Sequence, residues 1–163
     1  MMHISRFSSF TLNENDKSHC KLYHGLKGHN EFKEFNFETF PYFYLTPNEG
    51  YAGTYGDVQS FDVDTTGFLD LTKFGIKPMD FKTTQVEFYK QTKLYFPPDL
   101  ANNKSAKYAF WERLRMDTNG ILKKRLMAVG IHGIIMKEEA NRTIGGGSRE
   151  YTVYVLFDNT VLR

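Results

Sequence analysis

The stretch Lys21-Leu-Tyr-His-Gly-Leu-Lys-Gly-His29 decides how this chain is interpreted. Its first six residues form a short apolar run, which predicts a β-strand. Tyr23, His24 and Gly25 follow one another within this run. At the end of a strand, these residues place an imidazole beside backbone that a glycine leaves uncovered. The stretch therefore predicts a binding site for a flat polar ligand.

The composition of the chain favours a single soluble domain over residues 1–163. Aromatic residues make up 16% of the sequence, so the core and any binding surface are rich in rings. The net charge of +2 points neither to a nucleic-acid binder nor to a binder of acidic ligands. The single cysteine, Cys20, excludes a disulfide framework and suits a reducing compartment. Since we find no signal peptide and no run of about 20 apolar residues, we expect a cytoplasmic protein without a membrane partner.

Glycine, proline and polar residues that favour turns divide the chain into segments, and these segments predict strands at both ends of the chain and helices in the middle. In the first half we expect strands over 21–26, 38–46, 57–64 and 68–71, and a short helix over 51–55. In the second half we expect helices over 84–94, 105–117 and 121–129, the last capped by Gly130, then strands over 131–136 and 150–157. Residues 138–148, with glycines at 145–147, predict a loop between those last two strands.

Four motifs in order along the chain carry a family resemblance. They are Tyr23-His24-Gly25, then Tyr44-Leu-Thr46, then Tyr55 eleven positions on, and Glu150 at the start of a late strand. This order resembles the His-Tyr-Glu class of ADP-ribosyltransferases. That class includes the poly(ADP-ribose) polymerase catalytic domain, diphtheria toxin and small phage and bacterial transferases. The resemblance implies an α+β fold with a split, mostly antiparallel β core and flanking helices.

The resemblance also implies NAD as co-substrate, with no metal. His24 would bond the adenosine ribose, and the backbone of Gly25 would hold the nicotinamide carboxamide. Tyr44 and Tyr55 would flank the nicotinamide ring, with Tyr23 beside them in the cofactor site. Glu150 would bond the nicotinamide ribose, stabilise the cationic transition state and align the acceptor. The expected catalytic residues are therefore His24, Tyr44 and Glu150.

Each assignment has a competing residue or role in the sequence. Strand alternation puts Tyr42 on the same face as Tyr44, so the choice of Tyr44 rests on the resemblance. Glu138 and Glu139 compete with Glu150 as the carboxylate, on the other side of the glycine loop. His24 could also be an ordinary structural histidine, as we expect for His132.

The function that these expectations describe is mono-ADP-ribosylation of a macromolecule, with protein as the expected acceptor. If the chain belongs to a phage, as the resemblance to phage members suggests, the setting is the host cytoplasm. Nucleic acid is a second possible acceptor, because basic residues recur in the helical region at Lys104, Lys107, Arg113, Arg115 and 123–125. We interpret these residues as a solvated helix face. The sequence is also compatible with an NAD glycohydrolase, and with a non-catalytic module that binds NAD or ADP-ribose.

Overall fold

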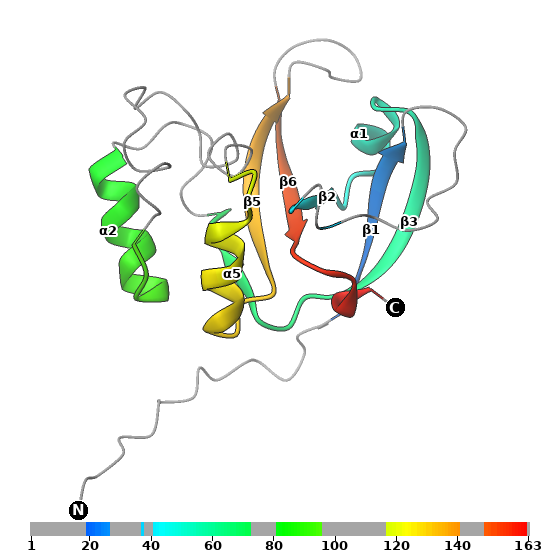
Figure 1. Cartoon of the computed structure of the whole chain (residues 1–163). Helices are drawn as coiled ribbons and strands as arrows, with labels where there is room; N and C mark the ends of the chain where they lie inside the picture. The colour runs from blue at the N-terminus through cyan, green and yellow to red at the C-terminus, as the bar shows by residue number, and fades with distance from the viewer. Residues whose placement is uncertain are drawn as a thin grey trace, which may run out of the picture.

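Strands account for most of the regular structure, and short helices lie beside them (Figure 1). The computed structural model describes residues 19–26, 37, 41–72, 81–95, 117–140 and 149–162. The strands are β1 (His19–Leu26), β2 (Phe43–Leu45), β3 (Asp57–Asp64), β4 (Phe68–Asp70), β5 (Gly133–Ala140) and β6 (Arg149–Leu156). The helices are α1 (Glu49–Gly53), α2 (Phe81–Thr92), α5 (Ile121–Ala128) and the 3₁₀ turn η2 (Asn159–Val161). None of these described helices is long and apolar enough to cross a membrane.

The strands form two sheets. β1 and β3 make an antiparallel pair, and β2, β6, β5 and β4 follow one another in a four-stranded sheet. In the larger sheet β6 runs antiparallel to both neighbours, whereas β4 pairs with β5 in parallel. An isolated antiparallel bridge between Tyr23 of β1 and Thr46, the residue after β2, connects the two sheets. The predicted α+β class, with a mostly antiparallel core, is confirmed.

Side chains of the larger sheet alternate between two faces, and each face has its own core. The inner face packs against the β1–β3 pair, and its buried residues are Leu22, Phe43, Leu45, Val63, Leu156 and Val161. The outer face packs against α2 and α5, and its buried residues include Phe88, Leu122, Leu126, Ile134, Met136, Val153 and Val155. Figure 1 shows α5 alongside β5, and α1 near the upper end of β1. This alternation decides which side chains can share a site.

Most predicted elements are present. The predicted segments 21–26, 57–64, 68–71, 84–94, 121–129 and 150–157 correspond to β1, β3, β4, α2, α5 and β6, with ends displaced by at most three residues. The helix predicted from Tyr51 begins two residues earlier, because the Tyr51 N–H donates to the side chain of Asn48 at 2.8 Å and so caps α1. The strand predicted over 38–46 is longer than the one found, because β2 covers only Phe43–Leu45. Residues 38–40 lie outside the described residues.

The prediction of a loop from Glu138 is wrong. β5 continues to Ala140, and it pairs Glu138 with Tyr151 and Glu139 with Glu150 of β6. A run of charged residues resembles a loop in sequence, but the cross-strand partners in β6 extend the ladder through it. The expected start at Ile131 is also displaced, because the strand begins at Gly133. The glycines at 145–147 and the helix predicted over 105–117 lie outside the described residues.

A buried carboxylate fixes the start of α5. Asp117 is only 5% exposed, and its carboxylate accepts a hydrogen bond from the Tyr42 hydroxyl. It also accepts the N–H groups of Ile121, Leu122 and Lys123 at 3.0, 3.1 and 3.4 Å. Burial and the neighbouring carboxylate raise the pKa of Tyr42, so its hydroxyl stays protonated and donates. The negative charge therefore satisfies the first turn of the helix and ties it to the residue before β2.

We expect Asp117→Ala to lower the free energy of unfolding by about 2 to 4 kcal/mol, because it leaves three helix N–H groups and a buried hydroxyl without their acceptor. Urea denaturation followed by circular dichroism measures the loss. Asp70→Ala is the control, since Asp70 accepts from Thr72 at an exposed site. Equal losses in the two variants would show that the Asp117 network contributes nothing beyond an ordinary surface turn.

Candidate functional site

The imidazole of His24 is held in one orientation on the inner face. Its ring lies 4.6 Å from the ring of Phe43, measured between centroids. Its Nδ1 lies 2.8 Å from the main-chain carbonyl oxygen of Tyr44, which can only accept, so Nδ1 carries the proton. Burial lowers the pKa of His24, and the hydrogen bond to Tyr44 opposes this only in part. The neutral ring therefore presents Nε2 as an acceptor.

This histidine lies where β1 and β2 part. Tyr23 and Thr46 exchange two backbone hydrogen bonds, at 2.8 and 2.9 Å. The next carbonyl of β2 on that edge belongs to Tyr44, and it accepts from the imidazole of His24 rather than from the backbone of β1. The imidazole of His24 thus replaces the backbone donor that β1 would supply if its pairing with β2 continued. The two sheets are split at this position.

Gly25 lies beside the split, with its backbone groups on the open edge. N–H and C=O groups alternate sides along a strand, so those of Gly25 point the same way as those of Tyr23, away from β3. Within the described residues, no backbone group outside the β1–β3 ladder bonds to Gly25. Its Cα faces α1, and a Cβ there would lie 2.0 Å from the carbonyl oxygen of Ala52 and 2.9 Å from Cβ of Tyr55. Only glycine lets α1 bring Tyr55 this close to the open edge.

Tyr55 belongs to a cluster of aromatic hydroxyls at the end of α1. Its hydroxyl lies 2.7 Å from that of Tyr51, which in turn donates to Oε2 of Glu138 at 3.3 Å. The Tyr51 ring stacks on Tyr151 of β6, with centroids 3.9 Å apart and planes at 7°. Burial, with help from Tyr55 and Glu138, raises the pKa of Tyr51 and keeps it a donor. The directed chain from Tyr55 through Tyr51 to Glu138 fixes the Tyr55 ring beside Gly25.

Sequence reasoning missed Tyr51 and Tyr151 as members of this cluster. One signal was present, because Tyr51 and Tyr55 are four residues apart where a helix was expected. The stack on Tyr151 had no signal, since it depends on where β6 lies. The Tyr55 ring packs against the Tyr51 ring, edge to face with centroids 5.4 Å apart.

Tyr44 contributes to the site through its main chain. Its carbonyl orients His24, while its ring lies on the outer face and packs against the outer-face core. Tyr42 lies on the same face, as alternation predicted, but it is only 7% exposed and its hydroxyl donates to Asp117. Both rings thus lie on the outer face, away from His24, and of Tyr44 only the main-chain carbonyl contacts the histidine.

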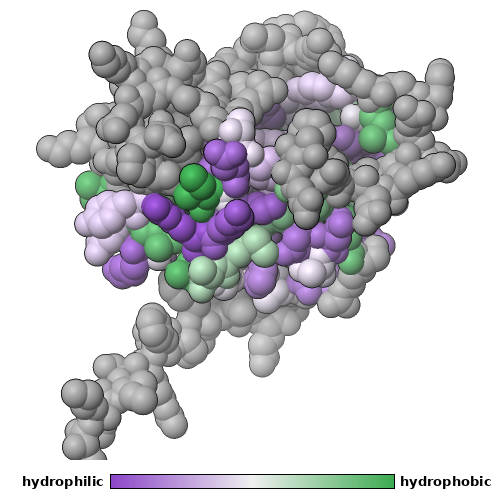
Figure 2. All heavy atoms as spheres, in the orientation of Figure 1, coloured by the Kyte–Doolittle hydropathy of each residue, from purple (hydrophilic) through white to green (hydrophobic). Residues whose placement is uncertain are grey.

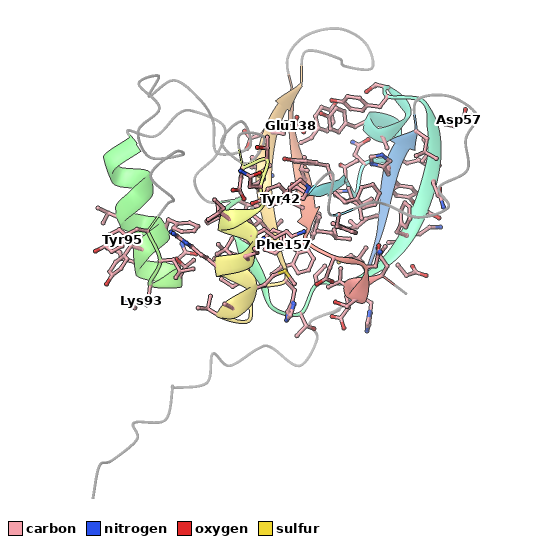
Figure 3. The ribbon with its side chains drawn as sticks, in the orientation of Figure 1. Tyr42, Asp57, Lys93, Tyr95, Glu138 and Phe157 are labelled. Atoms are coloured by element: carbon pink, nitrogen blue, oxygen red, sulfur yellow. The ribbon has the colours of Figure 1, made fainter. Side chains whose placement is uncertain are left out.

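The candidate carboxylates lie on opposite faces of the β5–β6 pair. Glu150 is exposed at the start of β6, and alternation places it on the inner face with Tyr154 and Leu156, the face on which His24 lies. Glu138, labelled in Figure 3 near the upper end of β5, belongs to the outer face and to the tyrosine cluster. Of the two carboxylates, only Glu150 thus shares a face with His24.

Tyr23 anchors the split from the side of β1. Its backbone makes the bridge to Thr46, and Nζ of Lys21 lies 5.9 Å from the centroid of its ring. Thr46 continues the connection, because its hydroxyl donates to the carbonyl of Thr152 in β6 at 3.0 Å. Among the described residues, no group of three His, Cys, Asp or Glu side chains is placed to hold a metal ion.

Comparisons of the chain with protein-family models, with curated proteins and with solved structures find no match. The function is therefore inferred from the geometry of its own residues.

Proposed function

We propose that this protein is a mono-ADP-ribosyltransferase that uses NAD as co-substrate and protein as acceptor. One observation carries the proposal. His24 bonds the carbonyl of Tyr44 at the point where β1 and β2 part, and among the described residues this leaves the backbone N–H and C=O of Gly25 on an open edge beside Tyr55.

The edge at Gly25 is complementary to a primary carboxamide. Its N–H can donate to the amide oxygen, and its C=O can accept from the amide nitrogen, as a neighbouring strand would do. Nicotinamide presents this pair of groups on a flat ring, and Tyr55 supplies an aromatic residue whose Cβ lies close to Gly25. The leaving group of NAD would therefore be held by backbone atoms and an immobilised tyrosine.

His24 fits a contact with a sugar hydroxyl. Because Nδ1 donates to Tyr44, Nε2 remains as an acceptor on a neutral ring. A ribose hydroxyl is a suitable donor to it, and the fixed ring would orient the nucleoside without supplying charge.

Glu150 would act on the bond that breaks. The bond between ribose C1′ and the nicotinamide nitrogen breaks, its electron pair leaves with nicotinamide, and positive charge develops on the ribose. A carboxylate on the inner face stabilises that charge. The acceptor atom then forms a bond to C1′ and releases its proton, which Glu150 would receive.

Incubation with NAD labelled in its adenylate phosphate tests this function. Purified protein and a lysate are mixed with the label, and both released nicotinamide and macromolecular label are measured. Nicotinamide release with label that protease removes supports the proposal. Label removed by nuclease would identify nucleic acid as acceptor, and free ADP-ribose as the main product would identify a glycohydrolase. Bound NAD without nicotinamide release would leave a binding module, and absence of NAD binding would overturn the proposal.

We expect affinity for NAD to fall as the pH drops below 6.5, the usual imidazole pKa. Burial lowers the pKa of His24, so Nε2 still accepts at neutral pH and becomes protonated only in more acidic solution. By the same shift, the neutral ring stabilises the folded chain above pH 6.5, and this contribution is lost as the pH falls through the lowered pKa. Calorimetry over a series of pH values from neutral into acid should show binding that weakens as His24 is protonated, by roughly tenfold once the acceptor is lost.

Two variants separate His24 from other titrating groups. His24→Gln has no imidazole to protonate, so its affinity for NAD should depend little on pH. His132→Gln removes a histidine of the turn before β5 and should keep the dependence of the unaltered protein. If the affinity of His24→Gln for NAD changed with pH as much as that of the unaltered protein, a group other than His24 would be responsible for the pH dependence.

A further inference from the structure

A surface at the end of α2 lies outside the proposed NAD site. Tyr89 and Tyr95 stack there, with ring centroids 4.5 Å apart and planes at 24°. They remain open to solvent, with 37% of Tyr89 and 67% of Tyr95 exposed. Figure 3 shows Tyr95 and Lys93 at the lower end of α2, on the side away from α5. We call Tyr89, Lys93 and Tyr95 the tyrosine platform.

The turn after α2 holds the platform in place. Lys93 has a left-handed φ of 59°, and its N–H donates to the carbonyl of Tyr89 at 2.7 Å. Leu94 then packs against the outer-face core, and its N–H donates to the hydroxyl of Thr92 at 3.1 Å. A lysine adopts this conformation only where its surroundings impose it. The chain therefore returns Tyr95 to the Tyr89 ring and leaves the stacked pair facing water.

The stretch of sequence that contains the platform is basic, although the whole chain is nearly neutral. Residues 81–130 contain ten Lys and Arg against four Asp and Glu, a net charge of +6. The remainder of the chain has eleven and fifteen, a net charge of −4, and the two together give the overall +2. One of the four acids, Asp117, is buried against the start of α5. The described surface over α2 and α5 is largely hydrophilic, with apolar residues between (Figure 2).

Aromatic rings and ammonium groups are adjacent in the platform. Nζ of Lys93 lies 5.8 Å from the centroid of the Tyr89 ring. Exposed rings with nearby cations suit single strands of nucleic acid, because bases stack on the rings and phosphates pair with the cations. An acidic protein would use the charges but would gain little from a stacked pair of exposed rings.

We propose that the tyrosine platform, at the end of α2, binds single-stranded nucleic acid. A base stacks on the exposed ring of Tyr95, and Lys93 contacts the adjoining phosphate. The sequence alone favoured a solvated helix face for the basic residues Lys104, Lys107, Arg113, Arg115 and 123–125, and it did not single out Lys93. The exposed ring stack is the observation that favours a ligand at the platform. This binding does not depend on the proposed NAD reaction.

Fluorescence anisotropy with short labelled DNA and RNA strands tests the proposal on the full chain. We expect binding at about 50 mM salt that weakens as salt is raised, as for other phosphate contacts. Tyr95→Ala should weaken binding about tenfold, the usual effect of losing one stacked base. Tyr95→Phe keeps a ring for stacking and should bind nearly as the unaltered protein does. Circular dichroism melting confirms that both variants fold.

A charge-matched pair of variants tests the location. Lys93→Gln and Lys21→Gln each remove one exposed lysine that lies over a tyrosine ring, at 5.8 and 5.9 Å. Only Lys93→Gln should weaken binding and reduce its salt dependence. Equal effects in the two variants would mean unspecific attraction and overturn the site. Absence of oligonucleotide binding at low salt would overturn the proposal. It would also be overturned if polyglutamate displaced the strand and Tyr95→Ala did not change the affinity for the oligonucleotide.

Discussion

Replacement of Glu150 by glutamine is expected to slow nicotinamide release from NAD by at least about a hundredfold, the range for loss of one charged group that stabilises a transition state. Glutamine keeps the size and hydrogen-bonding capacity of the side chain but not its charge. Because Glu150 is exposed at the start of β6, the fold should be unaffected. NAD affinity should change little, since positive charge on the ribose develops only as the bond breaks.

Single-turnover release of nicotinamide, with NAD binding measured separately by calorimetry, distinguishes the two effects. Glu138→Gln is the matched control, because Glu138 lies on the outer face and contacts Tyr51. Glu138→Gln should slow nicotinamide release less than Glu150→Gln does, because it acts only through the tyrosine cluster. If Glu138→Gln abolishes release and Glu150→Gln does not, the catalytic carboxylate is Glu138 and the role given to the inner face is wrong.

Gly25→Ala is expected to remove NAD binding and to destabilise the fold by about 3 kcal/mol, at the upper end of the cost of overpacking. The added Cβ would lie 2.0 Å from the carbonyl oxygen of Ala52, a backbone atom that cannot rotate away. Relief of that contact requires α1 to move outward. Tyr55 would move with it, and the open edge of β1 would lose the ring beside it.

Gly53→Ala supplies the control within the same helix. A Cβ at Gly53 would meet the Val58 side chain at 3.6 Å, an ordinary contact, and alanine is favoured in helices by up to about 1 kcal/mol. Urea denaturation and calorimetry with NAD compare the two variants. If Gly25→Ala left both the free energy of unfolding and the affinity for NAD unchanged, α1 would not pack against Gly25 as described.

Local patterns were sufficient to predict the elements that hold the site. The apolar run before Gly25 predicts β1, and the β-branched and aromatic run after Glu150 predicts β6. Alternation also placed Tyr42 and Tyr44 on one face, which the outer-face core confirms. These predictions succeed because strand period and turn residues depend only on neighbours in sequence.

Contacts between distant residues could not be predicted in this way. Tyr42 and Asp117 are separated by 75 positions, and Tyr51 and Glu138 by 87. Nothing in the order of residues indicates that Asp117 is buried, since an aspartate before Asn119-Gly120 is typical of an exposed turn. The extension of β5 through Glu138 was missed for the same reason, because its ladder depends on partners in β6.

The imidazole of His24 gives the split sheet a chemical selectivity. Because it occupies the carbonyl of Tyr44 in β2, the ligand that we propose for Gly25 must supply both the donor and the acceptor of a missing strand residue. Nicotinamide can imitate a peptide group in this way. Nicotinic acid cannot, because its carboxylate has no N–H for the Gly25 carbonyl and brings a negative charge against it. The open edge of β1 would therefore favour an amide over an acid on the same ring.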